Sequence, residues 1–355
     1  MNSKDKMIRE VDAVLASTVA CAMFRSGPDA RASVCDELVS VAQNYGVEAI
    51  VQRAVWHKLV GTVDWVLEDC ESAALVRAVA PYALRARHEQ NLQSQVLELA
   101  LDSLQKIPTL LLKGAALRPL IYPMVGHRSM GDIDLWVAPG AVDAACRALR
   151  SAGFIQAGPD DEHKHHAAPL AYRGVTVEVH RRFLGGGCAD RWETVAPRAV
   201  RLDRPGEVFR PCTADLIWQA WHHTFRSAIH WQSWQLVGVS DIVRLLQLPD
   251  VDWSRVSNWT GLTRLRQIYP WPHKFLHNFR NILPELSGVD YRPIQVDGDR
   301  RAVWQWYWPS AWWLAMRHGI LGESLAECWD RHLEDLAAQR RYHDCEPAAI
   351  YSDVV

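Results

Sequence analysis

The chain has 355 residues, of which 39 are Lys or Arg and 41 are Asp or Glu, so its formal net charge is −2. This near-neutral balance argues against a protein whose main task is to coat nucleic acid or an anionic membrane, but it leaves nucleotide substrates open. No apolar run reaches the roughly 18 residues that a membrane-spanning helix requires. The length is sufficient for two or three domains with a sizeable core.

The cysteines and the first residues indicate the compartment. The eight cysteines are scattered and contain no Cys-x-x-Cys pair, and the first residues lack the apolar core of a signal peptide. Free thiols in a reducing cytoplasm are the simplest account, so we expect a cytoplasmic protein.

Composition divides the chain into three parts. Residues 1–83 have apolar residues at helical spacing and predict an N-terminal helical region, and a long helix is expected from Leu84 to Lys106. Residues 84–211 carry strand and helix patterns and predict an α/β core. Residues 212–355 hold thirteen of the seventeen tryptophans, in clusters such as 304–308 and 312–313. These clusters favour the packed seams of a C-terminal helical domain over a wall for a ligand.

The first motif of the core is a strand followed by a glycine turn. Residues 109–112 predict a short buried strand, Lys113-Gly114 ends it, and residues 115–122 predict a helix that Pro119 interrupts. The first N–H groups of a helix are unpaired and favour an anion, and Lys113 would add a charge, so this turn could bind phosphate. A plain strand-to-helix turn would carry the same signal.

Two aspartates lie one residue apart in the next strand. In the run 128–137, which reads as a buried strand, Asp132 and Asp134 share one face and lie roughly 6.6 Å apart along the strand, while Ile133, Leu135 and Val137 face a core. Neighbouring carboxylates repel each other, and a divalent cation between them is the usual remedy.

A third acid lies on a strictly alternating strand, residues 175–180. Glu178 and His180 share its polar face. If this strand pairs beside the first, Glu178 joins Asp132 and Asp134 as an oxygen ligand. Three such ligands suit Mg²⁺ or Mn²⁺ rather than zinc. The alternative is that all three are merely exposed acids on strand faces.

Four motifs in this order resemble the uncharacterised nucleotidyltransferase family of the DNA polymerase β-like superfamily. They are Lys113-Gly114, Tyr122-Pro123, the run 128–135 and Glu178-Val-His180, within residues 84–245. The resemblance implies an α+β fold, with a small mixed β-sheet core flanked by helices. It also implies that Asp132, Asp134 and Glu178 hold two Mg²⁺ ions. By position, Gly114-Ala115 matches the superfamily's glycine-serine phosphate turn. Alanine replaces the serine here, and Ser129 is a candidate substitute.

The implied activity is nucleotidyl transfer. An NMP, with AMP favoured, would pass from an NTP to a hydroxyl or phosphate acceptor, and pyrophosphate would leave. Glu178 is the candidate base. Arg128 either neutralises charge on pyrophosphate or pairs with a local acid. His180 either orients a reacting group or only has its own hydrogen bonds satisfied at the strand end. The residues expected to bind the nucleotide are Lys113, Gly114, Ala115, Arg128, Ser129 and His180.

Other polar residues leave alternatives open. Asp241 either faces the cleft or caps a helix. The cluster 163–166 is more consistent with a solvated loop near the acceptor than with a zinc site. For His222-His223 we favour a structural role, because adjacent helical residues diverge.

The competing function is a catalytically silent fold whose Trp-rich half binds a peptide or protein. A hydrolase with two carboxylates fits the ligand-like spacing poorly. The expected partners are an NTP and an unidentified acceptor, which is a small molecule, peptide or protein. Long nucleic acid is disfavoured, no membrane is expected, and the oligomeric state stays open.

Overall fold

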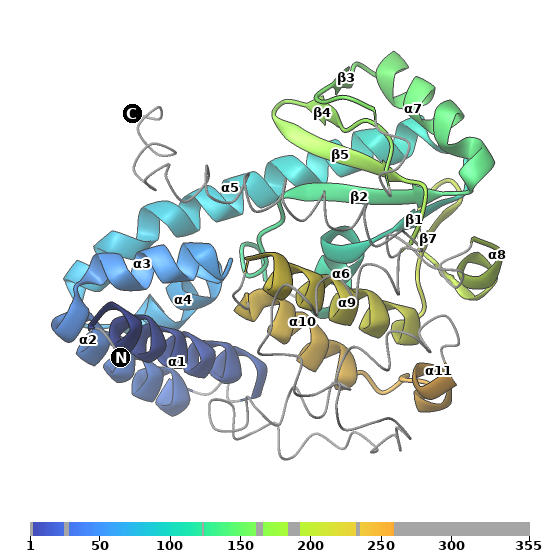
Figure 1. The fold of residues 1–355 in the computed structure, drawn as a ribbon. Coiled ribbons are helices and arrows are strands. Elements are labelled where there is room, and N and C mark those ends of the chain that lie inside the picture. Colours follow the sequence, from blue (N-terminus) through green and yellow to red (C-terminus); the bar gives the residue numbers. More distant parts are fainter. Residues whose placement is uncertain are drawn as a thin grey trace, which may run out of the picture. The chain divides into compact units, whose positions relative to one another are not determined.

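The computed structural model describes residues 3–24, 28–122, 124–160, 166–183, 192–231 and 235–258. All of them belong to one of the two compact units into which the chain divides (Figure 1). The helices are α1 (Ser3–Phe24), α2 (Pro28–Tyr45), α3 (Val47–Trp56), α4 (Val60–Val66), α5 (Ala73–Ser103), α6 (Lys113–Ile121), α7 (Val142–Ser151), α8 (Trp192–Val195), α9 (Thr213–Trp231), α10 (Leu236–Leu246) and α11 (Trp253–Asn258). The strands are β1 (Thr109–Leu111), β2 (Asp132–Val137), β3 (Ile155–Gln156), β4 (Leu170–Tyr172), β5 (Val175–His180), β6 (Val200–Arg201) and β7 (Val208–Arg210).

The seven strands form one mixed sheet in the order β3-β4-β5-β2-β1-β7-β6. β2 lies at its centre, parallel to β5 and antiparallel to β1. β1 is parallel to β7, while β4 is antiparallel to both β3 and β5. The predicted α+β class, with a mixed sheet flanked by helices, is therefore confirmed.

The alternation predicted for the two motif strands is present. Ile133, Leu135 and Val137 on β2 are fully buried, and Val177 on β5 is buried on the same side. On the other face of β2, Trp136 follows the aspartates and is also fully buried, against Phe183 and Trp192. Both faces of the central strand are thus fixed by packing, so a slip by one residue would bury the acids in the apolar core.

Helices from three parts of the sequence surround the sheet. α7 contacts β4 and β5, α5 contacts β5, and α6 contacts β2. α9 and α10 pack against each other and against α6, below the sheet in Figure 1. α6 continues through Pro119 to Ile121. The chain that follows the sheet therefore returns to the side of α6, next to the acid-bearing face of β2.

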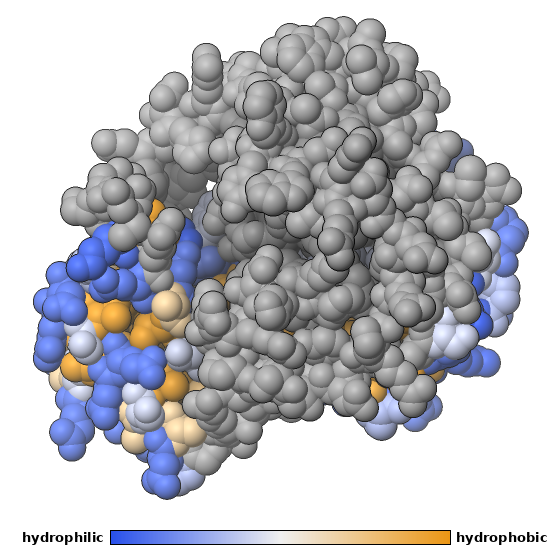
Figure 2. Space-filling model, turned by 60° about the horizontal axis from the view of Figure 1, so that its bottom comes forward, coloured by the Kyte–Doolittle hydropathy of each residue, from blue (hydrophilic) through white to orange (hydrophobic). Residues whose placement is uncertain are grey.

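The N-terminal helices α1 to α4 pack with one another, and α3 and α4 also pack against α5. The Arg53 guanidinium donates two hydrogen bonds to Asp12, at 2.7 and 2.6 Å, and ties α3 to α1. In the space-filling view of Figure 2, the coloured surface at the left mixes apolar and hydrophilic residues. No helix within the described ranges is long and apolar enough to cross a membrane.

One expectation about the cysteines is wrong. A disulfide joins Cys35 on α2 to Cys70, with the two Cα atoms 6.2 Å apart. The sequence separation of 35 residues hides this proximity, because only the packing of α2 against the segment after α4 creates it. Cys146 and Cys212 are not part of a disulfide.

The long helix α5 begins at Ala73 rather than at Leu84 and continues through Pro81. It therefore crosses the first of the two predicted domain boundaries, which follow residues 83 and 211, and the division into three domains stays a prediction. The tryptophan clusters at 304–308 and 312–313 lie outside the described residues.

Candidate functional site

The register between β2 and β5 sets two acids side by side. Asp134 is the direct partner of Glu178, and Asp132 is the partner of Thr176. Residues paired across neighbouring strands share a face of the sheet, and so do residues two apart in one strand. The three acids singled out in the sequence therefore project from the same face.

Asp134 is the most strongly engaged of these acids. Its Oδ1 atom lies 2.5 Å from Nζ of Lys113 and 2.6 Å from Nε2 of His180. Burial by itself would raise the pKa of Asp134, but Lys113 and His180 reverse this and hold it well below its usual range. Burial likewise opposes the charge on Lys113, yet the Asp134 carboxylate raises the pKa of that ammonium above its ordinary value.

Three side chains are close enough to share one metal ion. The potential ligand atoms of Asp134, Glu178 and His180 all lie within 4.8 Å of one another. Two carboxylates and an imidazole fit a divalent transition ion such as Mn²⁺ at least as well as Mg²⁺, which prefers oxygen. The third side chain of this group is thus His180, whereas the sequence predicted Asp132. Burial and the neighbouring Asp134 carboxylate raise the pKa of Asp132.

A histidine outside the predicted set contacts Glu178. Nε2 of His166 lies 3.5 Å from Oε1 of Glu178, and the two imidazoles of His166 and His180 lie 6.0 Å apart. An isolated β-bridge between residues 166 and 180 places His166 there. Nothing in the run 163–166 distinguishes His166 from its neighbours, because the bridge is a tertiary contact. Residues 163–165 lie outside the described residues.

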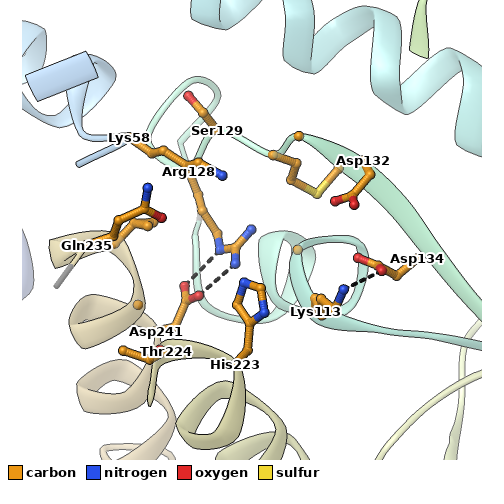
Figure 3. Close-up of a pocket in the computed structure, with 15 residues that line it drawn as sticks. Lys58, Lys113, Arg128, Ser129, Asp132, Asp134, His223, Thr224, Gln235 and Asp241 are labelled. Atoms are coloured by element: carbon orange, nitrogen blue, oxygen red, sulfur yellow. Dashed lines mark hydrogen bonds and ion pairs between the residues drawn. The ribbon is translucent and has the colours of Figure 1, made fainter. Parts of the chain in front are cut away.

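An open pocket with an empty volume of about 520 Å³ adjoins the aspartates (Figure 3). Its lining comes from the loop before β2, from the starts of β2 and α6, from α9 and α10, and from the turn after α3. The lining residues are Lys58, Lys113, Gly114, Arg128, Ser129, Met130, Gly131, Asp132, Asp134, His223, Thr224, Gln235, Val237, Gly238 and Asp241.

The turn at Lys113-Gly114 is shaped by packing. Lys113 has a φ of +44°, and its backbone N–H donates to Oε1 of Gln219 at 2.7 Å. This amide is therefore already paired, in contrast to the expectation of free helix N–H groups. A Cβ at Gly114 would collide with the side chains of Arg128 and Met130. Ala115 is buried and does not line the pocket, whereas Gly114 does.

Arg128 pairs with an acid from a distant helix. Its guanidinium donates to both carboxylate oxygens of Asp241 at 2.8 and 2.7 Å, as the dashed lines in Figure 3 show. The Tyr122 hydroxyl donates to the same carboxylate at 2.7 Å. Two roles were predicted for Arg128, neutralising charge on pyrophosphate or pairing with a local acid, and the structure shows the pairing with an acid. The helix-cap reading of Asp241 is wrong, because α10 begins at Leu236.

Lys58 and His223 are titratable pocket residues that were not predicted from the sequence to lie at the site. Lys58 follows α3 and reaches the pocket from the N-terminal region. His223, for which a structural role was favoured, is exposed and lines the pocket from α9. Ser129 lines it as well, so the hydroxyl expected there is at the site. No sequence motif marks Lys58 or His223, because both arrive through packing of helices.

An α+β core with an Asp-x-Asp strand beside an acid-bearing strand is consistent with a nucleotidyltransferase core. The family model described as uncharacterised nucleotidyltransferase matches residues 44–269, and the chain belongs to this family. The suspected family is thereby confirmed, and the match extends further towards the N-terminus than the predicted core. No curated protein and no solved structure matches the chain.

Proposed function

We propose that this protein is a Mg²⁺- or Mn²⁺-dependent nucleotidyltransferase. It transfers an NMP from an NTP, with ATP as the expected donor, to a hydroxyl or phosphate acceptor and releases pyrophosphate. The observation that carries the proposal is the in-register pair Asp134 and Glu178, with Asp132 on the same face at the edge of a pocket.

We take Asp134, Glu178 and His180, whose ligand atoms lie within 4.8 Å of one another, as the core of the metal site, with Asp132 on the same face as a further carboxylate. When bound, divalent ions would neutralise phosphate charge and lower the pKa of the acceptor hydroxyl. The site supports this reading because the Asp132 and Asp134 carboxylates repel each other, and Lys113 forms its ion pair with Asp134.

The protein's own groups account for the remaining steps. The acceptor oxygen attacks the α-phosphorus, the bond to the bridging oxygen of the β-phosphate breaks, and pyrophosphate carries away the electron pair. Glu178 accepts the acceptor's proton. His166 and His180, at 3.5 and 3.8 Å from the carboxylate, orient it.

In this proposal the pocket binds the NTP donor. Glu178 and His166 do not line the pocket, and they face the acceptor substrate. Arg128 braces the loop before β2 through Asp241 instead of contacting phosphate. The acceptor class is a small molecule, peptide or protein, and the net charge of −2 disfavours long nucleic acid. The cytoplasmic location was expected from free thiols, and the Cys35–Cys70 disulfide does not support it.

The test is incubation of the full chain with Mg²⁺ or Mn²⁺, each of the four NTPs labelled on the α-phosphate, and a broad acceptor panel. Label on an acceptor, with stoichiometric pyrophosphate, supports the proposal. Transfer from the γ-phosphate alone would indicate a kinase instead. Absence of both transfer and metal-dependent NTP binding would leave the alternative, a silent fold that binds a peptide or protein partner.

A further inference from the structure

Only some of the charged side chains that line the pocket form ion pairs with one another. Two of its three cations are matched by carboxylates, Lys113 by Asp134 at 2.5 Å and Arg128 by Asp241 at 2.7 Å. The Lys58 ammonium and the Asp132 carboxylate remain. Within the described part of the chain, no hydrogen bond or ion pair engages either side chain. The pocket therefore presents one unmatched cation and one unmatched anion.

These two groups lie at different places around the pocket. Figure 3 shows Lys58 beside Ser129 and Arg128, and Asp132 on the far side of Arg128 towards Asp134. An ammonium and a carboxylate that do not neutralise each other favour a ligand with charges of both signs. A metal-bound oligophosphate is such a ligand, since the metal can contact the carboxylate and the phosphate oxygens can contact the ammonium.

The turn that carries Lys58 is held in place by contacts of the two residues before it. Lys58 has a φ of +58°, which is uncommon for a residue with a side chain, directly after α3. The carbonyl of Trp56 accepts a hydrogen bond from the Gln235 side chain, and Nδ1 of His57 accepts one from the N–H of Leu236. The turn that carries Lys58 is thereby fixed to the start of α10, the helix that closes the other side of the pocket.

The electrostatic surroundings of Lys58 call for an anion. Burial lowers the pKa of Lys58, and the nearby charges of Arg128 and Lys113 lower it further, while Asp132 and Asp241 act in the opposite sense. A phosphate beside Lys58 would compensate for both the burial and the neighbouring cations. Ser129, which lies beside Lys58 in Figure 3, adds a hydroxyl hydrogen-bond donor at the same end.

We infer that Lys58 binds the terminal phosphates of the donor triphosphate, opposite the metal-binding carboxylates. This inference rests on the proposed function and deepens it, because it assigns the oligophosphate end of the pocket to a residue from the N-terminal helical region. Lys58 would hold the pyrophosphate portion through bond cleavage, and the part of the nucleotide that is transferred would face Asp134.

The test uses inorganic tripolyphosphate with Mg²⁺ as the probe and measures its affinity for the full chain by calorimetry. Lys58→Met should weaken binding by roughly 10- to 100-fold, the typical effect of losing one charge-assisted hydrogen bond. Lys58→Arg should restore affinity to within a few-fold of wild type. The matched control is Lys106→Met, which removes the same charge from an exposed lysine outside the pocket. Equal affinity of wild type and Lys58→Met would overturn the inference.

A second measurement uses the wild-type chain and does not depend on how the variants fold. Acetylation of lysines by a water-soluble active ester is followed by peptide mass spectrometry, with and without Mg²⁺-tripolyphosphate. Lys58 should be protected and Lys106 should not. Unchanged labelling of Lys58 under saturating probe, or absence of any tripolyphosphate binding, would contradict the inference.

Failure of the inference and failure of the proposed function give different results. If the α-phosphate of an NTP is transferred but Lys58→Met binds tripolyphosphate normally, the inference about Lys58 is wrong and the proposed function is supported. If Lys58 is required for tripolyphosphate binding but no label is transferred, the phosphate-binding site is supported and the proposed transferase reaction is wrong.

Discussion

The Lys113 ammonium lies 2.5 Å from Oδ1 of Asp134 and neutralises the most buried acid of the site. The same oxygen is 2.6 Å from Nε2 of His180. A metal ion that binds Asp134 must therefore share this carboxylate with two cationic or donor groups, or displace one of them. The Lys113–Asp134 contact makes lysine a counter-ion for the acid when no metal is bound.

Lys113→Met should destabilise the metal-free protein, because it leaves Asp134 buried without its main counter-ion. The expected loss in the free energy of unfolding is about 3–5 kcal/mol. Mn²⁺ should raise the free energy of unfolding of the variant by more than it raises that of the wild type, since it restores positive charge beside the carboxylate. Chemical denaturation with and without Mn²⁺ measures both effects, and Lys106→Met is the control. Equal Mn²⁺ stabilisation in variant and wild type would argue against a metal at Asp134.

Asp132→Asn separates stability from function. The Asp132 carboxylate is unmatched and lies close to Asp134, so its neutralisation should leave the free energy of unfolding unchanged or slightly higher. Nucleotidyl transfer should nevertheless fall by roughly 10²–10³-fold, because one metal-binding oxygen is lost. Transfer of α-phosphate label and denaturation are measured on the same preparation. The control is Asp143→Asn, which alters an exposed acid on α7. A variant as active as wild type would remove Asp132 from the site.

Gly114→Ala tests whether this glycine serves packing. The added Cβ would meet the Arg128 guanidinium and the Met130 side chain, both at the wall of the pocket. We expect a loss of about 1–3 kcal/mol in stability, together with weaker nucleotide binding as Arg128 shifts. Gly140→Ala is the matched control, since a Cβ there meets nothing within 4 Å. If both variants unfold at the same denaturant concentration, the close approach at Gly114 has no energetic consequence.

His127 predicts a loss of stability in acid. Burial lowers the pKa of His127 from its ordinary 6.5 to about 4. Between these two values the unfolded chain binds a proton that the folded chain does not, so the free energy of unfolding falls as pH decreases through this interval. The contribution of this single residue is at most about 3 kcal/mol. Denaturation curves at several pH values, for wild type and His127→Gln, isolate it.

The variant His127→Gln should show a shallower decrease in stability between pH 6.5 and 4 than the wild type, because glutamine does not titrate. Its counterpart, His88→Gln, changes an exposed histidine on α5 and should leave the wild-type decrease intact. Parallel curves for wild type and His127→Gln would show that the buried imidazole does not control acid stability.

The elements predicted most accurately are those whose pattern is local. β5 has the predicted range and β2 lies within the predicted run 128–137, because alternation of polar and apolar residues reports directly which face of a strand is buried. The start of α5 and the continuation of α6 through Pro119 were predicted less well. In both helices, packing against the rest of the fold outweighs the local cost of a proline.

The candidate site divides in the same way. Asp132, Asp134, Glu178 and Lys113 are readable from the chain, because their chemistry and spacing within two strands and a turn carry the signal. Lys58 and His166 come from segments about 75 residues before and about 30 residues after the Asp-x-Asp strand, and nothing in their local sequence marks them.

The sequence by itself determined the family, the α+β class and the acids of the central strands, since periodicity and residue type are local properties. Only the tertiary structure decided which cation neutralises which acid, that Arg128 is held by Asp241, and that Lys58 reaches the pocket unpaired. The physical reason is that ion pairing depends on distances of a few ångströms between elements remote in sequence. Those distances are fixed by the packing of α3, α9 and α10 around the sheet.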